Sequence, residues 1–147
     1  MTATFGIYVD ADNVSSQQCD LVIKQLASQG TIRFVKAYGN WQVKRGDWKE
    51  VCLKHGIIST HRFNHTNGKN SADISLVIDA VLDAQKSNLY NSIVVVSSDS
   101  DFMPLMRQAT VFGKTTIGFG QSKASKIYSQ TCDQFFYLED LATSSMH

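Results

Sequence analysis

Two clusters of acidic residues come directly after apolar segments that are typical of buried strands. Asp10 and Asp12 follow FGIYV, and Asp99 and Asp101 lie in the segment SIVVVSSDSDF. Two like charges at about 4 Å repel by roughly 4 kcal/mol at an effective dielectric of about 20. Carboxylates that share a small space therefore need protonation or a cation, and ligands that offer only oxygen favour Mg²⁺ or Mn²⁺ over zinc.

A further carboxylate lies in the middle of the chain. Asp73 occupies the first turn of the helical pattern SADISLVIDAVLDAQKS, after the polar loop NHTNGKNSA. We expect Asp10, Asp73 and Asp99 to hold the metal, and Asp101 to complete the cluster or to position water. Structural roles also stay open for three of the acids. Asp73 also fits the role of a first-turn acid favoured by the helix dipole, Asp101 that of an N-cap, and Asp12 that of a turn residue.

A neutral amide and two lysines flank the acidic residues. Asn13 follows the first cluster and can orient a phosphate or a water-bound ligand. Lys69 precedes the helix that carries Asp73 and can neutralise a phosphate oxygen. The segment GFGQSK shares only Gly-x-Gly with phosphate-binding loops, so it predicts a turn at a strand end in which Lys123 can touch a phosphate.

A basic stretch with aromatic residues predicts nucleic-acid binding. Residues 33–69 hold eight lysines and arginines against two acids. Trp41 lies there near Lys44 and Arg45, and proteins bind single strands by stacking bases on aromatic rings and by holding the backbone with cations. Together with the acidic clusters this stretch suggests hydrolysis of nucleic acid, although helix packing explains Trp48 equally well.

Short β-like segments alternate with helical patterns along the chain. The expected strands cover residues 5–10, 31–38, 56–63, 92–98, 114–120 and 134–139, and the expected helices cover 16–30, 41–56, 71–87 and 101–113. This alternation predicts an α/β fold with a mainly parallel sheet and helices on both faces. Ligands of such sheets bind where the strand order reverses, so Asp10 and Asp99 should end neighbouring strands.

The helix expected at 71–87 carries an apolar stripe with amphipathic spacing, the kind of face that a helix turns toward a core. The stripe consists of Ile74, Val77, Ile78, Val81 and Leu82. Two aspartates of this helix, Asp79 and Asp83, lie four residues apart and are expected on its solvated face.

Length and composition bound the class of protein. The 147 residues suit one domain, residues 1–147, whose last few residues we expect to be disordered. The chain begins without a basic, apolar leader, and no apolar run approaches the roughly 18 residues of a membrane-spanning helix. Three cysteines without C-x-x-C spacing, Cys19, Cys52 and Cys132, indicate reduced thiols. We therefore expect a cytoplasmic protein with no membrane partner.

In order and over nearly the whole chain, these motifs resemble those of the NYN domain family, LabA-like branch, within the PIN-like nuclease superfamily. YVDADN fits the Asp-x-x-Asn motif, KNSADISLVIDA the Lys-x-x-x-Asp helix start, and VVVSSDSDFMPLMRQA the Ser-x-Asp-x-Asp-Phe motif. GKTTIGFG resembles the next strand of the family, and ASKIYSQTCDQFFYL resembles its closing segment.

The resemblance implies a three-layer Rossmann-like (PIN-like) fold with strand order 3-2-1-4-5 and a Mg²⁺- or Mn²⁺-dependent ribonuclease site. The matched metal-binding carboxylates are Asp10, Asp73, Asp99 and Asp101, and the matched supporting residues are Asn13 and Ser97. Ala11 and Ser98 stand where members commonly carry Gly, and Asp12 adds a carboxylate that could alter the number of metals. The implied partner is RNA, single-stranded in preference to double-stranded, and a homo-oligomer is left open.

Two other functions stay open from the sequence. DADNV also resembles the opening Asp-x-Asp motif of haloacid-dehalogenase phosphatases, with Asp10 as the nucleophile. That family also needs a Ser or Thr at the end of the second strand, and the strand here ends in KAYGNW. The other function is an RNA-binding or scaffolding module with weak or no turnover, which metal-dependent cleavage of a labelled single-stranded RNA would separate from a nuclease.

Overall fold

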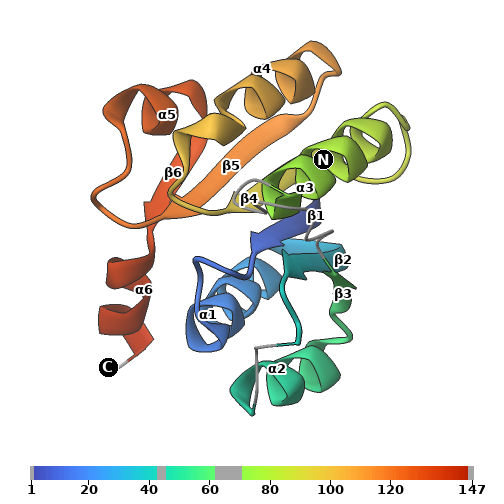
Figure 1. Ribbon diagram of the computed structural model, residues 1–147. Coiled ribbons are helices and arrows are strands. Elements are labelled where there is room, and N and C mark those ends of the chain that lie inside the picture. The colour runs from blue at the N-terminus through green and yellow to red at the C-terminus, as the bar shows by residue number, and fades with distance from the viewer. Residues whose placement is uncertain (1, 43–45, 62–70, 146–147) are drawn as a thin grey trace.

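Six parallel strands form one sheet in the order β3-β2-β1-β4-β5-β6 (Figure 1). The computed structural model describes residues 2–42, 46–61 and 71–145. The strands are β1 (Ala3–Asp10), β2 (Gly30–Gly39), β3 (Ile58–His61), β4 (Ser92–Val96), β5 (Thr115–Gly120) and β6 (Gln134–Tyr137). The prediction of a parallel α/β sheet with the order 3-2-1-4-5 is confirmed, and β6 extends the sheet beyond β5.

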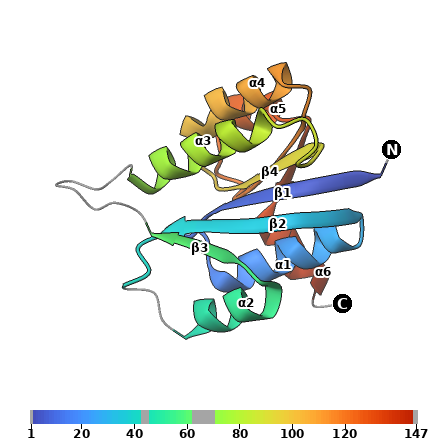
Figure 2. The same ribbon diagram turned by 90° about the vertical axis from the view of Figure 1, so that its right-hand side faces the viewer.

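Helices cover both faces of this sheet, so the molecule has three layers (Figures 1 and 2). One face carries α1 (Ser16–Ala27), α2 (Asp47–His55) and α6 (Leu138–Ser145). The other face carries α3 (Ser71–Ala84), α4 (Met103–Val111) and α5 (Lys126–Thr131), with the short 3-10 helix η1 (Ser100–Phe102) leading into α4.

Several predicted boundaries are wrong by two or more residues, and two of them have a clear local reason. The helix expected from Trp41 begins only at Asp47, directly after Gly46, whose φ of 60° lies in the left-handed region that favours glycine. The strand expected to run through residue 139 ends at Tyr137, because Leu138 begins α6 and is buried in the core beneath α1.

The central strands β1 and β4 send alternate side chains into two separate cores. Ile7 and Val9 pack with α1 and α6 on one side, whereas Tyr8 packs with α3 and α4 on the other. Val94 and Val95 of β4 divide in the same way, and all five side chains are fully buried. Burial of each such apolar side chain contributes about 1.5–3 kcal/mol, which holds β1 and β4 together as neighbours.

Helix α3 turns only part of the expected apolar stripe to the sheet. Leu76 and Ala80 are fully buried, and Asp83 is buried beside them. The apolar residues Ile74, Ile78 and Leu82 are instead 54–58% exposed. The expected stripe therefore faces the core only through Val77 and Val81, which pack against it. The expectation that Asp79 and Asp83 are solvated is wrong, because tyrosines of the sheet bind both aspartates.

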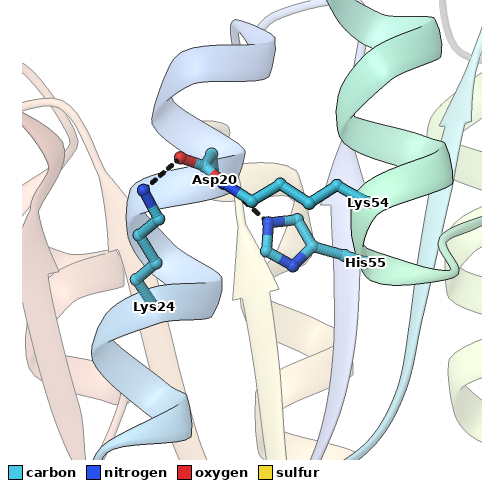
Figure 3. A network of polar contacts seen from close by, with 4 residues as sticks. All are labelled: Asp20, Lys24, Lys54 and His55. Atoms are coloured by element: carbon cyan, nitrogen blue, oxygen red, sulfur yellow. Dashed lines mark hydrogen bonds and ion pairs between the residues drawn. The ribbon is translucent and has the colours of Figure 1, made fainter.

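A polar network joins α1 to α2 on the opposite face (Figure 3). Asp20 of α1 contacts Lys24 at 3.0 Å, and it contacts Lys54 and His55 of α2 at 3.3 and 2.6 Å. Partial burial opposes ionisation, but the hydrogen bonds from His55, Lys24 and Lys54 outweigh it and lower the pKa of Asp20 to about 2. The network therefore stabilises the packing of α2 on α1 while Asp20 is ionised.

The cysteines are free thiols, as predicted from their number and spacing. Cys19 and Cys132 are buried and Cys52 is half-buried. Over residues 2–42, 46–61 and 71–145, no helix has the length and apolar character needed to cross a membrane.

Candidate metal centre

The strand order brings Asp10 and Asp99 to the same end of adjacent strands. Asp10 is the last residue of β1, and its neighbour Val9 pairs with Val96 at the end of β4. The Ser97 hydroxyl donates to Asp10 Oδ2 at 2.9 Å and accepts from the backbone N–H of Asp99 at 3.2 Å. One serine thus links the two strand ends at the reversal of strand order, where the sequence predicted them to meet.

Asp10 is a buried carboxylate whose two oxygens have different surroundings. Its Oδ2 accepts from Asn13 Nδ2 at 2.9 Å as well as from Ser97. Its Oδ1 is buried and has no hydrogen-bond partner among the described residues. Burial raises the pKa of Asp10, the two hydrogen bonds oppose this, and the charges of Asp12 and Asp99 add to the rise. A buried acceptor without a partner is costly unless a cation or a donor reaches it.

Three other carboxylates converge beside Asp10. Asp73, Asp99 and Asp101 each offer one oxygen, and these oxygens all lie within 4.8 Å of one another. Asp73 comes from the first turn of α3, and the other two flank the start of η1. Asp10 is not part of this close group, although its charge acts on Asp73. The structure therefore brings three of the four predicted ligands together and places the fourth next to them.

Asp99, and not Asp101, caps the helix that follows β4. Asp99 Oδ1 accepts from the backbone N–H of Asp101 at 2.9 Å, which is N-cap geometry. The structural role suggested for Asp101 is therefore wrong. Its exposed side chain turns toward Asp73 and Asp99 instead.

The surrounding acids affect the pKa of Asp73. Burial raises the pKa of Asp73 to about 7, with further contributions from Asp10, from the charge and hydrogen bond of Asp99, and from Asp101. Near neutral pH the half-buried Asp73 is therefore divided between its protonated and ionised forms while no cation is bound. A divalent ion would replace that proton, because the ionised carboxylate is the ligand.

A hollow of about 310 Å³ opens beside the carboxylates. It is lined by Asn13, Ser97, Ser98, Asp99, Gln121 and Lys123. Ser98 Oγ accepts from the backbone N–H of Gln121 at 2.7 Å, which fixes the turn after β5. GFGQSK thus forms the end of β5 and a turn, as predicted, and the turn brings the exposed Lys123 to the same hollow as Asp99.

Gly120 lies where β5 passes close to the end of β4. A Cβ on Gly120 would lie 3.0 Å from the Ser97 carbonyl oxygen and 2.9 Å from the Phe135 ring. A larger residue there would push against the backbone segment that carries Ser97 and Asp99.

Asp12 and Trp41, two further predicted site residues, lie outside the carboxylate group. Asp12 is exposed, and its Oδ1 accepts from the backbone N–H of Asn40 at 3.0 Å, so it ties the end of β2 to the end of β1. Trp41 is half-buried; its indole N–H donates to the Thr60 carbonyl at 2.9 Å, and its ring meets Trp48 edge-on at 5.5 Å. The structure does not describe Lys44, Arg45 and Lys69.

Sequence reasoning missed the buried tyrosines behind the site. Tyr38 donates to Asp79 Oδ2 at 2.8 Å, and Tyr8 donates to Asp83 Oδ2 at 2.7 Å. A tyrosine within a buried strand is a signal for such contacts, because its hydroxyl needs a partner when it leaves water. Its partner cannot be found from spacing, since Tyr8 and Asp83 are 75 residues apart.

Comparison with known proteins gives one family and one fold. The sequence model of a family described as NYN domain matches residues 4–139. The structure is similar to the crystal structure of a protein of unknown function from Vibrio parahaemolyticus, with a TM-score of 0.71, 18% sequence identity and 95% of each chain covered. At this identity the likeness shows the fold alone. Among curated proteins, no sequence matches this chain.

Proposed function

Because this chain belongs to the NYN domain family, we propose that it is a divalent-metal-dependent nuclease that hydrolyses the phosphodiester bonds of RNA. The NYN family lies within the PIN-like nuclease superfamily, and the motifs of this chain resemble its LabA-like branch. One observation carries the proposal: the oxygens of Asp73, Asp99 and Asp101 lie within 4.8 Å of one another, beside the unpartnered Oδ1 of Asp10.

The donor set fits a hard cation. Carboxylate oxygens are the ligands of Mg²⁺ and Mn²⁺, and no histidine or cysteine shares the group formed by Asp73, Asp99 and Asp101 within the described part of the chain. These three residues would hold the ion, and Asp10 would contribute through its buried Oδ1. When bound, such an ion activates water and stabilises the oxygen that leaves a phosphodiester.

The residues around the carboxylates have supporting roles in this proposal. Asn13 and Ser97 occupy Oδ2 of Asp10 and so orient its Oδ1. Lys123 lines the same hollow as Asp99, so its ammonium group would bind a phosphate of the substrate there. We also propose that Lys69 binds a phosphate, because it matches the lysine of the Lys-x-x-x-Asp motif.

The proposed substrate is single-stranded RNA. Trp41, Lys44 and Arg45 are the proposed binding surface, and the half-buried Trp41 keeps part of its ring accessible to a base. The proposal takes residues 1–147 as one catalytic domain and the cytoplasm as its location.

Cleavage of a labelled single-stranded RNA with Mn²⁺ or Mg²⁺ tests the function. Asp99→Asn should lower the cleavage rate by at least about 100-fold, because it removes a charged ligand. It should leave the metal-free stability unchanged or slightly higher, because Asn still caps η1 and one repelling charge is gone. Asp140→Asn, on the exposed surface of α6, is the matched control and should cleave like the unmodified protein.

Two outcomes would contradict the proposal. Equal cleavage by the unmodified protein and by Asp99→Asn would place the activity elsewhere. Binding of the RNA without any metal-dependent cleavage would support the RNA-binding module instead.

A further inference from the structure

Helix α3 packs Leu76, Val77, Ala80 and Val81 against the core but leaves another row of large apolar residues exposed. Ile74, Ile78 and Leu82 recur every four residues and are more than half exposed. The opposite face of the helix is buried and includes the aspartate Asp83. A helix held only by the hydrophobic effect would turn its largest apolar residues toward the sheet. Since apolar residues lie on both sides of α3, burial of apolar surface does not by itself select this rotation, and a directional interaction can decide it.

Five polar residues supply that interaction. Tyr38 of β2 donates to Asp79 Oδ2 at 2.8 Å, and Tyr8 of β1 donates to Asp83 Oδ2 at 2.7 Å. Lys36 of β2 forms an ion pair with the same Asp83 oxygen at 2.8 Å. Both tyrosines are fully buried, and the side chains of Lys36 and Asp83 are only 21% and 10% exposed. Burial strengthens these bonds and makes their loss costly.

The same two strands carry the metal centre. Side chains alternate along a strand, so Tyr8 and Asp10 lie on one face of β1, and Lys36 and Tyr38 lie on one face of β2. The register pairs Tyr8 with Lys36 and Asp10 with Tyr38. Tyr8 and Tyr38 therefore lie on the same face of the sheet as Asp10. Helix α3, which carries Asp73, covers this face.

We propose that Tyr8, Lys36, Tyr38, Asp79 and Asp83, here called the α3 clamp, set the rotation of α3 and thereby position Asp73 for the metal. This inference rests on the proposed function, because it assigns the clamp a purpose at that site. The clamp residues are positioning residues, since they act on the metal only through the placement of Asp73.

The geometry makes metal affinity sensitive to this rotation. Side chains extend about 5–6 Å from a helix axis, so a rotation of roughly 30° would displace the Asp73 carboxylate by about 3 Å. Metal–oxygen distances tolerate changes of only about 0.2 Å. A small turn of α3 toward its apolar side would therefore remove Asp73 from the group that it forms with Asp99 and Asp101.

Calorimetric titration of the metal-free full chain with Mn²⁺ tests the clamp. Tyr38→Phe removes one donor to Asp79 and should weaken Mn²⁺ binding by about tenfold. Asp79→Asn keeps an oxygen that accepts from Tyr38 and should stay within about twofold of the unmodified protein. Tyr128→Phe is the control, because it removes a buried hydroxyl that has no partner among the described residues, and it should bind Mn²⁺ normally.

A thiol introduced on the exposed row reports the rotation without any metal. Position 78 is 54% exposed, so the thiol of Ile78→Cys should react rapidly. The same thiol should react more slowly when Tyr38→Phe, or the partly exposed Lys36→Met, is added to it. The native cysteines provide the background rate, measured in the same variants without the new thiol.

The outcomes separate the clamp from the proposed function. Weaker Mn²⁺ binding by Tyr38→Phe at a temperature where it is fully folded, together with slower reaction at position 78, supports the clamp. Unchanged affinity and unchanged reactivity overturn the clamp and leave the nuclease proposal standing. Absence of Mn²⁺ binding by the unmodified protein overturns the proposed function itself, while the thiol experiment still decides whether the clamp sets the rotation.

Discussion

The hydroxyl of Ser97 holds two neighbouring acidic residues, Asp10 and Asp99, in position. It donates to Asp10 Oδ2 and accepts the backbone N–H of Asp99, so it fixes both at once. With Asn13 on the same Oδ2, the ionised form of Asp10 is stabilised against the cost of burial. A small polar residue is needed here because Ser97 is itself fully buried between the strand ends.

Ser97→Ala should weaken Mn²⁺ binding by about tenfold. The variant removes one of two hydrogen bonds that favour ionised Asp10, so the pKa of Asp10 should rise further and protons should compete better with the metal. Calorimetry at two pH values checks this, and the deficit should be larger at the lower pH. Ser129→Ala, whose hydroxyl donates within α5, is the control and should titrate normally; a similar loss there would remove the argument for Ser97.

The titration of Asp73 predicts how stability depends on pH in the absence of metal. Asp73 ionises near a pKa of about 3.9 in an unfolded chain, but its pKa is about 7 in the folded protein. Between these values the folded state binds more protons than the unfolded state, so its stability falls as pH rises. We expect the metal-free protein to lose about 1–2 kcal/mol between pH 5 and pH 7.5 from this group, allowing for solvent screening.

Urea unfolding of the metal-free protein across this pH range measures the effect. Asp73→Asn should flatten the profile, because its amide does not titrate. Excess Mn²⁺ should reverse the trend, since metal binding requires the ionised carboxylate. A profile that is the same for Asp73→Asn and the unmodified protein would mean that Asp73 does not titrate as described.

At the level of helices and strands, local patterns predicted some features and missed others. The run of consecutive apolar residues in β4 predicted a strand buried on both faces, and the acids that follow β1 and β4 were expected to meet, as they do in the structure. The orientation of α3 was missed because it depends on contacts between distant parts of the chain. Tyr38 and Asp79 are 41 residues apart, and nothing in the spacing of either segment links them.

The contact between α1 and α2 gives a prediction that is independent of the metal. Asp20→Asn should lower the free energy of unfolding by about 1–2 kcal/mol at pH 7, since it removes charge-assisted hydrogen bonds to His55 and Lys54. The folded pKa of Asp20 is about 2, below its unfolded value, so the stability that it contributes is present above about pH 4 and is lost toward pH 2.

Urea unfolding of both proteins between pH 7 and pH 2 checks this, and their difference should vanish at the acidic end. Lys24→Gln removes only an exposed pair within α1 and should lower the free energy of unfolding much less than Asp20→Asn does. A constant difference at all pH values would show that the charge of Asp20 is not its source.

For the molecule as a whole, the sequence predicted the layers, the strand order and the end of the sheet at which the acids gather. The layers follow from the alternating periodicities, whereas the strand order was implied by the resemblance to the NYN family. The acids were expected at the carboxyl ends of the strands, where the strand order reverses. Both Asp99 and Asp101 join the carboxylate group, but which of them caps η1 was not predictable, because both fit an N-cap by position. The backbone after β4 decides between them.

The two cores differ in the kind of contact that their side chains make, and this affects how readily their residues can be replaced. The core beneath α1 consists mainly of aliphatic side chains, such as Val22 and Leu26, whose contacts have no preferred direction. The core beneath α3 contains Tyr8, Tyr38 and Tyr90, and two of these bind specific aspartates. Saturation mutagenesis should therefore find many acceptable replacements in the first core and few in the second. Neutral drift would remodel one side of the sheet while the other kept its original residues.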